Sequence, residues 1–292
     1  MECISEQVAI AAPENWALAG TLFMPKDRSD AAGPVILLSG AAAVPHSYYA
    51  AHAAYLVAQG AAAVLTYDYR GIAASAGERS RWPQLKMKDW ALLDFPAAAA
   101  WLRSRFPHNP LVGLGHSYGG QALGLSGVSG EFERYATVAT MSGYWRDLDE
   151  PWGVLVKTRV VGSAFARLLG HIPSWAGLGE TMPGSIFLDW ARWISKPDYF
   201  FSDPQLPEIS RFADVTLPLL VVGLRDDPWG TPKAINTFMA NYTAADLRSL
   251  WLEPGESGKI GHLGYFRPRH EREHWLQVSD FLLQGIWPDG AA

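Results

Sequence analysis

The segment Gly115-His116-Ser117-Tyr118-Gly119 constrains the fold more than any other part of the chain. An apolar run from Leu111 precedes it and a small-residue, helix-compatible stretch follows, which is the strand–turn–helix context in which a serine becomes a nucleophile. The sharp turn strains the serine backbone, so both neighbours must lack bulk, and Gly115 and Gly119 meet that need. A helix that begins after Ser117 would direct its free N–H groups at the site and stabilise an oxyanion there. The alternative is that Ser117 only caps a helix, and the partners of Ser117 decide between the two.

Two carboxylates and one histidine follow Ser117 in the order serine, acid, histidine. The apolar run 217–223 leads into Asp226 and Asp227, and the run 247–252 leads into a loop that contains His262. Loops at the carboxyl ends of parallel strands meet at one edge of a sheet, so these side chains are expected to converge. A serine hydroxyl needs a histidine as base and a third group that orients the histidine. We predict Ser117, His262 and Asp226 as catalytic residues, with Asp227 as the alternative acid, because Asp226 stands closer to the predicted strand exit.

An oxyanion needs two backbone N–H donors. Tyr118, directly after the serine, is the first predicted donor. The loop after the apolar run 35–39 reads Ser39-Gly40-Ala41-Ala42-Ala43, and its small side chains allow the backbone to approach a substrate. We predict Ala41 as the second donor, with Ala42 next in order.

Strand-like and helix-like segments alternate along most of the chain, which predicts an α/β fold with a mostly parallel, eight-stranded sheet covered by helices on both faces. Residues 4–10 and 17–24 predict an antiparallel hairpin at the sheet edge. Further strands are predicted over 35–39, 61–67, 111–115, 135–141, 217–223 and 247–252, and helices over 47–59, 85–105 and 271–284.

Residues 144–206 break this alternation, since they contain five tryptophans, five prolines and no clear strand. Helices are predicted there over 154–169 and 185–194. We interpret the segment as a helical cap inserted over the ligand-binding edge of the sheet, with residues 1–143 and 207–292 as the core. Trp145, Trp190 and Trp193 are then candidates for substrate binding. The alternative is an ordinary helical excursion whose tryptophans pack on the core.

Composition narrows the classes of partner and compartment. The 292 residues are 49% hydrophobic, carry a formal net charge of -5 and show no basic run, which argues against nucleic acid and an anionic membrane surface as partners. Residues 31–67 contain no Asp, Glu, Lys or Arg, but glycines, prolines and histidines divide them into pieces shorter than the roughly 20 apolar residues of a membrane span.

Cys3 is the sole cysteine and no signal-peptide pattern follows Met1, so we expect a cytoplasmic protein without stable membrane insertion. The sequence leaves a homodimer open.

No metal or cofactor site is predicted. His270 and His274 are four residues apart, but without a third ligand we interpret them as part of a solvated helix face. Gly113-Leu114-Gly115 lacks the rest of a dinucleotide-binding fingerprint.

Five short segments together resemble the α/β-hydrolase superfamily over nearly the whole chain, and especially uncharacterised bacterial members near the serine aminopeptidase and monoglyceride lipase-like group. They are residues 39–41, 67–71, 115–119, 223–227 and 261–266; the run 190–193 also resembles that subgroup. The resemblance implies the α/β-hydrolase fold, a triad of Ser117, an aspartate and His262, and oxyanion donors at Ala41 and Tyr118. Ser39-Gly40 stands where the family more commonly has His-Gly.

These observations predict a serine hydrolase that acts on a small-molecule carboxylic ester, or a thioester, with an apolar portion. One alternative is a peptidase or amidase with the same triad, in which an acid of the cap, such as Asp147, Asp149, Glu150 or Glu180, would bind a free amino terminus. The other alternative is a ligand-binding protein on the same fold with no turnover.

Overall fold

The structure is a computed structural model that describes residues 2–27 and 32–292. The strands have the following bounds: β1 (Cys3–Ala12), β2 (Trp16–Pro25), β3 (Val35–Ser39), β4 (Ala63–Tyr67), β5 (Leu111–His116), β6 (Tyr135–Val138), β7 (His171–Ile172), β8 (Met182–Pro183), β9 (Pro218–Leu224) and β10 (Asp246–Leu252). The α-helices have the following bounds: α1 (Ala50–Ala58), α2 (Met87–Asp89), α3 (Phe95–Arg105), α4 (Tyr118–Ser126), α5 (Pro151–Leu155), α6 (Ser163–Leu169), α7 (Gly184–Trp193), α8 (Pro232–Met239), α9 (Gly261–Gly264) and α10 (Leu276–Gln284).

The central sheet has eight strands in the order β1-β2-β4-β3-β5-β6-β9-β10. The β1–β2 and β2–β4 pairs are antiparallel and every other pair is parallel. The predicted edge hairpin and mostly parallel eight-stranded sheet are therefore confirmed. The inner strands β3, β4, β5 and β6 are buried along their whole length, which explains why they are continuous apolar runs rather than alternating ones.

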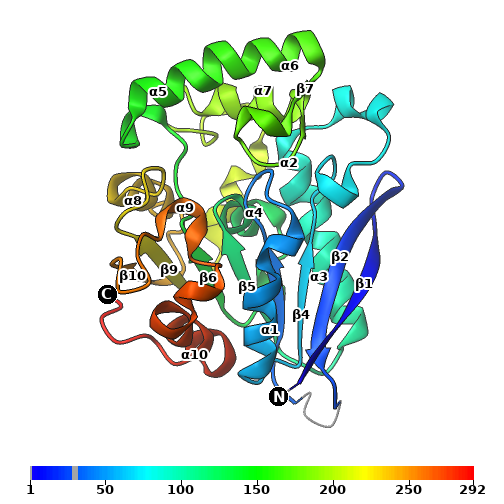
Figure 1. Cartoon of the computed structure of the whole chain (residues 1–292), viewed down its shortest axis with the longest axis vertical. Helices are drawn as coiled ribbons and strands as arrows, with labels where there is room; N and C mark the ends of the chain where they lie inside the picture. The colour runs from blue at the N-terminus through cyan, green and yellow to red at the C-terminus, as the bar shows by residue number, and fades with distance from the viewer. Residues whose placement is uncertain (1, 28–31) are drawn as a thin grey trace.

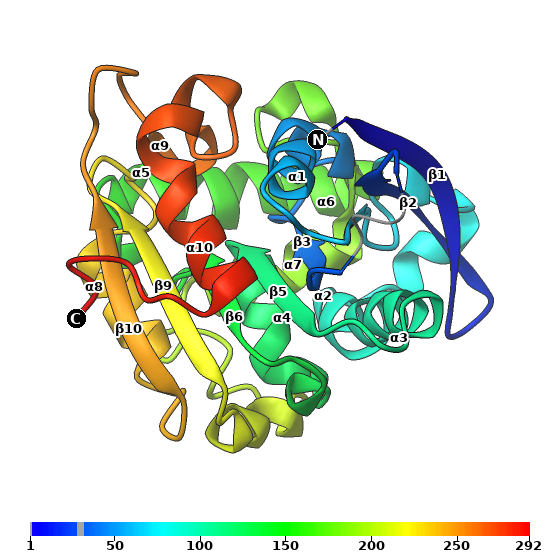
Figure 2. The same ribbon diagram turned by 90° about the horizontal axis from the view of Figure 1, so that it is seen from below.

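Helices cover both faces of this sheet (Figure 2). One core, which includes Leu56, Trp275 and Val278, lies between the sheet and the helices α1 and α10. The other core includes Leu102 of α3, Leu123 of α4 and many residues of the segment 144–206, which is called the cap below. Since both faces are covered, the loops at the strand ends are the parts of the sheet open to a ligand.

The segment 144–206 leaves the sheet after β6 and returns at β9 (Figure 1). Its helices α5 and α6 are joined by a π-helical stretch, Val156–Gly162, into one long helix that lies outermost above the sheet. The predicted helices are present, but β7 and β8, each two residues long, form a small antiparallel pair that the sequence did not indicate. Among the described residues, no helix is long and apolar enough to span a membrane.

Candidate active site

Ser117 stands in a strained turn between β5 and α4. Its backbone angles are φ 51° and ψ -111°, a conformation that side-chain-bearing residues rarely adopt. The turn is held because the Ser117 N–H donates to Val138 O at 2.9 Å and the Thr140 hydroxyl donates to Ser117 O at 2.9 Å. A Cβ at Gly119 would collide with the carbonyl oxygen of Ser39, so the glycine allows α4 to approach the β3 loop. The serine hydroxyl is thereby fixed at the carboxyl end of the sheet.

His262 and Asp227 complete a line of hydrogen bonds with this serine. His262, in the short helix α9, has its Nε2 3.1 Å from Ser117 Oγ. Its Nδ1 lies 2.7 Å from Asp227 Oδ2, in the loop after β9. A carboxylate only accepts, so Nδ1 carries the proton and Nε2 presents a lone pair to the serine hydroxyl. This is the geometry in which a histidine removes a proton from serine.

The preference for Asp226 as the acid is wrong in this geometry. Its two carboxylate oxygens accept the N–H groups of Ile260 at 2.8 Å and Gly261 at 2.9 Å, so Asp226 braces the loop that carries His262. Adjacent side chains in this turn point in different directions, and only that of Asp227 faces the imidazole. Asp226 therefore holds the histidine loop and Asp227 holds the histidine ring.

Asp227 is buried, and its carboxylate is stabilised by several donors. Burial works to raise the pKa of Asp227, but the charge and hydrogen bond of His262, with the N–H groups of Gly230 and Trp229, hold that pKa below its ordinary value. The Trp229 N–H donates to Oδ1 at 2.8 Å. Asp227 therefore stays ionised at neutral pH and fixes the imidazole tautomer.

The structure also changes the assignment of the second oxyanion donor. The Ala41 N–H donates to the Tyr49 hydroxyl at 2.8 Å and is not available to a substrate. Ala41 to Val44 form a turn, in which the Val44 N–H donates to Ala41 O and Ala43 has φ 58°. The Ala42 N–H makes no hydrogen bond with any residue that the structure describes, so Ala42 replaces Ala41 as the candidate. Tyr118 is the first residue of α4, and its N–H has no partner within the helix.

A buried hydrogen-bond chain connects this turn to the histidine loop. The carbonyl oxygen of His262 accepts from His116 Nε2 at 2.8 Å, so the proton of neutral His116 is on Nε2. His116 Nδ1 then accepts from the Tyr49 hydroxyl at 2.9 Å, and Tyr49 in turn accepts from Ala41. Burial lowers the pKa of His116 to about 3, with the charge of His262 acting in the same direction, so this arrangement persists at neutral pH. His116 and Tyr49 therefore connect the turn of Ser117 to the loop of His262, and no sequence pattern marks either residue for this role.

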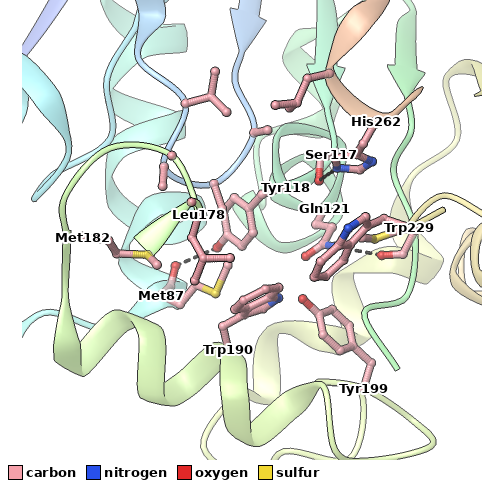
Figure 3. A pocket seen from close by; sticks show the side chains of 18 residues that line it. Met87, Ser117, Tyr118, Gln121, Leu178, Met182, Trp190, Tyr199, Trp229 and His262 are labelled. Carbon is pink, nitrogen blue, oxygen red and sulfur yellow. Dashed lines mark hydrogen bonds between the residues drawn. The ribbon is translucent and has the colours of Figure 1, made fainter. Parts of the chain in front are cut away.

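A cavity of about 230 Å³ lies in front of Ser117 (Figure 3). Apart from Ser117 and His262, it is lined by apolar and uncharged groups from the core and the cap. The side chains labelled in Figure 3 are Met87, Tyr118, Gln121, Leu178, Met182, Trp190, Tyr199 and Trp229. Gln121 Nε2 donates to Met141 O at 2.9 Å, and its Oε1 has no hydrogen-bond partner among the described residues.

Of the three predicted substrate-binding tryptophans, only Trp190 lines the cavity. It stacks on Trp229 with the ring centroids 5.8 Å apart. Trp193 is buried and its indole N–H donates to Asp203 Oδ2 at 2.6 Å. Trp145 is also buried and packs against Trp152. The last two therefore pack against other residues of the segment 144–206 and do not line the cavity.

Several cavity residues were missed because no motif marks them. Met87, Tyr199 and Gln121 come from three distant segments. Trp229 had a usable signal, since it stands two residues after Asp227 in a loop already assigned to the site.

A side-chain cluster near the start of the C-terminal helix corrects the interpretation of His270 and His274. Both are buried, and Glu273 supplies the third group that the sequence interpretation lacked; the three ligand atoms lie within 4.8 Å of one another. Hydrogen bonds already occupy two of the three groups. Ser257 Oγ contacts His270 Nδ1 at 2.7 Å and donates to Glu273 Oε2 at 2.5 Å, while Arg269 Nε donates to His270 Nε2 at 3.0 Å. The cluster ties the loop before His262 to the last helix.

Comparison with known proteins agrees with this architecture. The model of the alpha/beta hydrolase family matches residues 35–272. The structure of an esterase of Pyrococcus furiosus matches this one with a TM-score of 0.63 and 17% sequence identity, and the match covers 96% of this chain and 90% of the esterase. An acylaminoacyl peptidase of Pyrococcus horikoshii has a TM-score of 0.62 and 14% identity, over 98% of this chain and 42% of that one. A thioesterase domain from the curacin biosynthetic pathway matches with a TM-score of 0.56 and 10% sequence identity, and the match covers 96% of this chain and 99% of that domain. No curated protein sequence matches the chain.

Proposed function

The chain belongs to the α/β-hydrolase family, and from that premise we propose that it is a serine hydrolase that cleaves carboxylic esters or thioesters through an acyl-enzyme on Ser117. The proposal rests on two hydrogen bonds in front of an uncharged cavity. His262 Nε2 lies 3.1 Å from Ser117 Oγ, and His262 Nδ1 lies 2.7 Å from Asp227 Oδ2.

In the first half-reaction Ser117 Oγ attacks the ester carbonyl while its proton passes to His262 Nε2. The negative charge on the carbonyl oxygen is stabilised by the N–H groups of Tyr118 and Ala42. Asp227 stabilises the imidazolium that forms. The imidazolium then gives its proton to the leaving alcohol or thiol, and the acyl group remains on Ser117. In the second half-reaction water attacks the acyl-enzyme, with His262 acting as base and then as acid.

The lining of the cavity supports an ester with an apolar acyl or alcohol group over a peptide with a free amino terminus. A protonated amine needs a carboxylate, and no Asp or Glu side chain lines the cavity among the described residues. The cap acids Asp147, Asp149, Glu150 and Glu180, named above for an amide-cleaving alternative, do not line it either.

Turnover of a p-nitrophenyl ester series with acyl chains of increasing length tests the proposal. We expect wild-type activity to depend on chain length, and Ser117→Ala to lose it with the melting temperature unchanged. Ser126→Ala is the matched control, since this buried serine at the far end of α4 does not line the cavity; its hydroxyl donates to Leu123 O and accepts from the Val128 N–H. Undiminished turnover in Ser117→Ala contradicts the proposal. Faster turnover of aminoacyl amides than of every ester would favour the peptidase alternative.

A further inference from the structure

The outer side of the long cap helix is covered by large apolar side chains. Trp152 is 68% exposed, Val160 62% and Leu168 82%, and Trp175 shortly after the helix is 73% exposed. We call the following set the cap ridge: Trp152, Val156, Val160, Val161, Leu168, Leu169 and Trp175. The remaining large hydrophobic side chains exposed on the described surface, such as Ile286, are scattered over other elements. A group of large exposed apolar side chains on one element marks an interaction site.

No other part of the described chain covers the cap ridge. The opposite side of the same helix is the buried one, with Val154, Thr158 and Ala166 directed toward the rest of the cap. A Cβ at Gly162 would collide with the ring of Phe187 in α7, so the helix already packs as closely as it can on that side. Figure 1 places α5 and α6 as the outermost elements above the sheet.

The charge of this element is opposite to that of the whole chain, so the expectation from the net charge that an anionic membrane surface is not a partner does not hold for the cap ridge. Residues 151–179 contain Lys157, Arg159 and Arg167 and no Asp or Glu, whereas the chain carries a net charge of -5. Within residues 2–27 and 32–292, no carboxylate forms an ion pair with any of the three cations. An amphipathic helix with tryptophan and aliphatic residues on its exposed apolar side and basic residues beside them is suited to the interface of an anionic lipid layer.

We propose that the cap ridge docks on anionic lipid surfaces, with the helix lying in the plane of the headgroups. A symmetric contact with a second copy of the chain would bring Lys157, Arg159 and Arg167 of both copies together, which electrostatic repulsion disfavours. A lipid surface with negative headgroups instead pairs with all three cations while the apolar side chains enter the acyl region.

The docked cap would also bring the cavity close to the lipid. Trp175 is followed directly by the loop with Gly177, Leu178 and Gly179, which lines the cavity. The next residue ties that loop to the oxyanion turn, since the Glu180 N–H donates to Ala43 O at 2.7 Å. The surface that meets the lipid is therefore continuous with the wall of the cavity.

Flotation of the full chain with vesicles tests the proposal without any need for turnover. Vesicles of phosphatidylcholine alone are compared with vesicles that contain one third phosphatidylglycerol, at low and high salt. We expect flotation with the anionic vesicles that weakens as salt increases. Val160→Asp and Leu168→Asp should each reduce the partition coefficient at least about tenfold. Arg159→Gln should reduce it about fivefold.

Two controls make the result specific to the cap. Ile286→Asp removes an apolar side chain of similar exposure and Arg272→Gln removes an exposed cation, both far along the chain from the cap. Neither should change flotation by more than about twofold. The proposal is overturned by failure to float with anionic vesicles, or by flotation that Val160→Asp and Leu168→Asp leave intact. A dimer in analytical ultracentrifugation that becomes monomeric in Val160→Asp would also overturn it, in favour of a second copy as the occupant.

Discussion

Replacement of Asp227 by asparagine should disable the site through the tautomer of His262 rather than through loss of size. The aspartate accepts from His262 Nδ1 through Oδ2 and from the Trp229 N–H through Oδ1. Asparagine has one acceptor and one donor for these two neighbours. If its oxygen keeps the Trp229 N–H, its NH₂ group faces His262 Nδ1 and forces the ring proton onto Nε2, which then no longer accepts from Ser117.

The expected loss follows from that wrong tautomer. We expect kcat for a p-nitrophenyl ester to fall by about 10³–10⁴, equivalent to about 4–5.5 kcal/mol in the barrier. The rate of reaction with a fluorophosphonate should fall by a similar factor, because the same deprotonation of Ser117 is needed.

Asp226→Asn is the matched comparison because it makes the same chemical change one residue away. Its amide cannot accept both the Ile260 and Gly261 N–H groups, so the histidine loop should lose about 1–3 kcal/mol of stability. The melting temperature should therefore drop by several degrees, with kcat reduced less than about tenfold. Asp226→Asn as inactive as Asp227→Asn, or Asp227→Asn with more than a tenth of wild-type kcat, would refute the reasoning.

Three further outcomes are expected. Ala42→Pro removes one N–H at a turn position that suits proline, so kcat should fall about 10²–10³-fold while Ala43→Gly has little effect; equal activity in both variants would remove Ala42 as a donor. Burial lowers the pKa of His52 and of His116 from 6.5 to about 3. Between pH 6.5 and about 3 the unfolded chain therefore binds these two protons and the folded chain does not. When the pH falls from 7.5 to 5.5, each histidine should lower the unfolding free energy by about 1.4 kcal/mol. His52→Phe, which also removes a ring without hydrogen-bond partners among the described residues, should reduce the change in unfolding free energy over this pH range by about 1.4 kcal/mol in urea titrations. Gln121→Leu should lower kcat/KM for esters with a hydroxylated acyl chain more than for plain alkyl esters, because Gln121 Oε1 is an unpaired acceptor in the cavity wall.

The strands were predictable because each is a local apolar run, and the differences lie at their ends. The run 135–141 predicts a strand to Met141, but β6 ends at Val138 because Ala139 adopts φ 53° and turns the chain. Pro96 falls inside the predicted helix 85–105, and a proline in a helix interior usually kinks it. It is the second residue of α3, and a π-helical stretch, Trp90–Asp94, directly precedes α3 and joins it to α2.

The residue types of the site and their order along the chain could be predicted from the sequence. Which of two neighbouring residues contacts its partner could not. The choice between Asp226 and Asp227 depends on which of two adjacent side chains faces His262, and distance along the sequence carries no such information. The N–H of Ala41 is taken by Tyr49, a contact between a loop and a helix that no local pattern encodes. Hydrophobicity also does not separate a tryptophan that lines a cavity, such as Trp190, from one that supports the cap, such as Trp193.

Labelling of the folded protein with a fluorophosphonate probe, mapped by mass spectrometry of its peptides, tests the central claim most directly. The account predicts one adduct per chain, on Ser117, and its near-complete loss in His262→Ala. An unlabelled Ser117 in folded protein, or an adduct on another serine such as Ser257 beside His270 and Glu273, would contradict it.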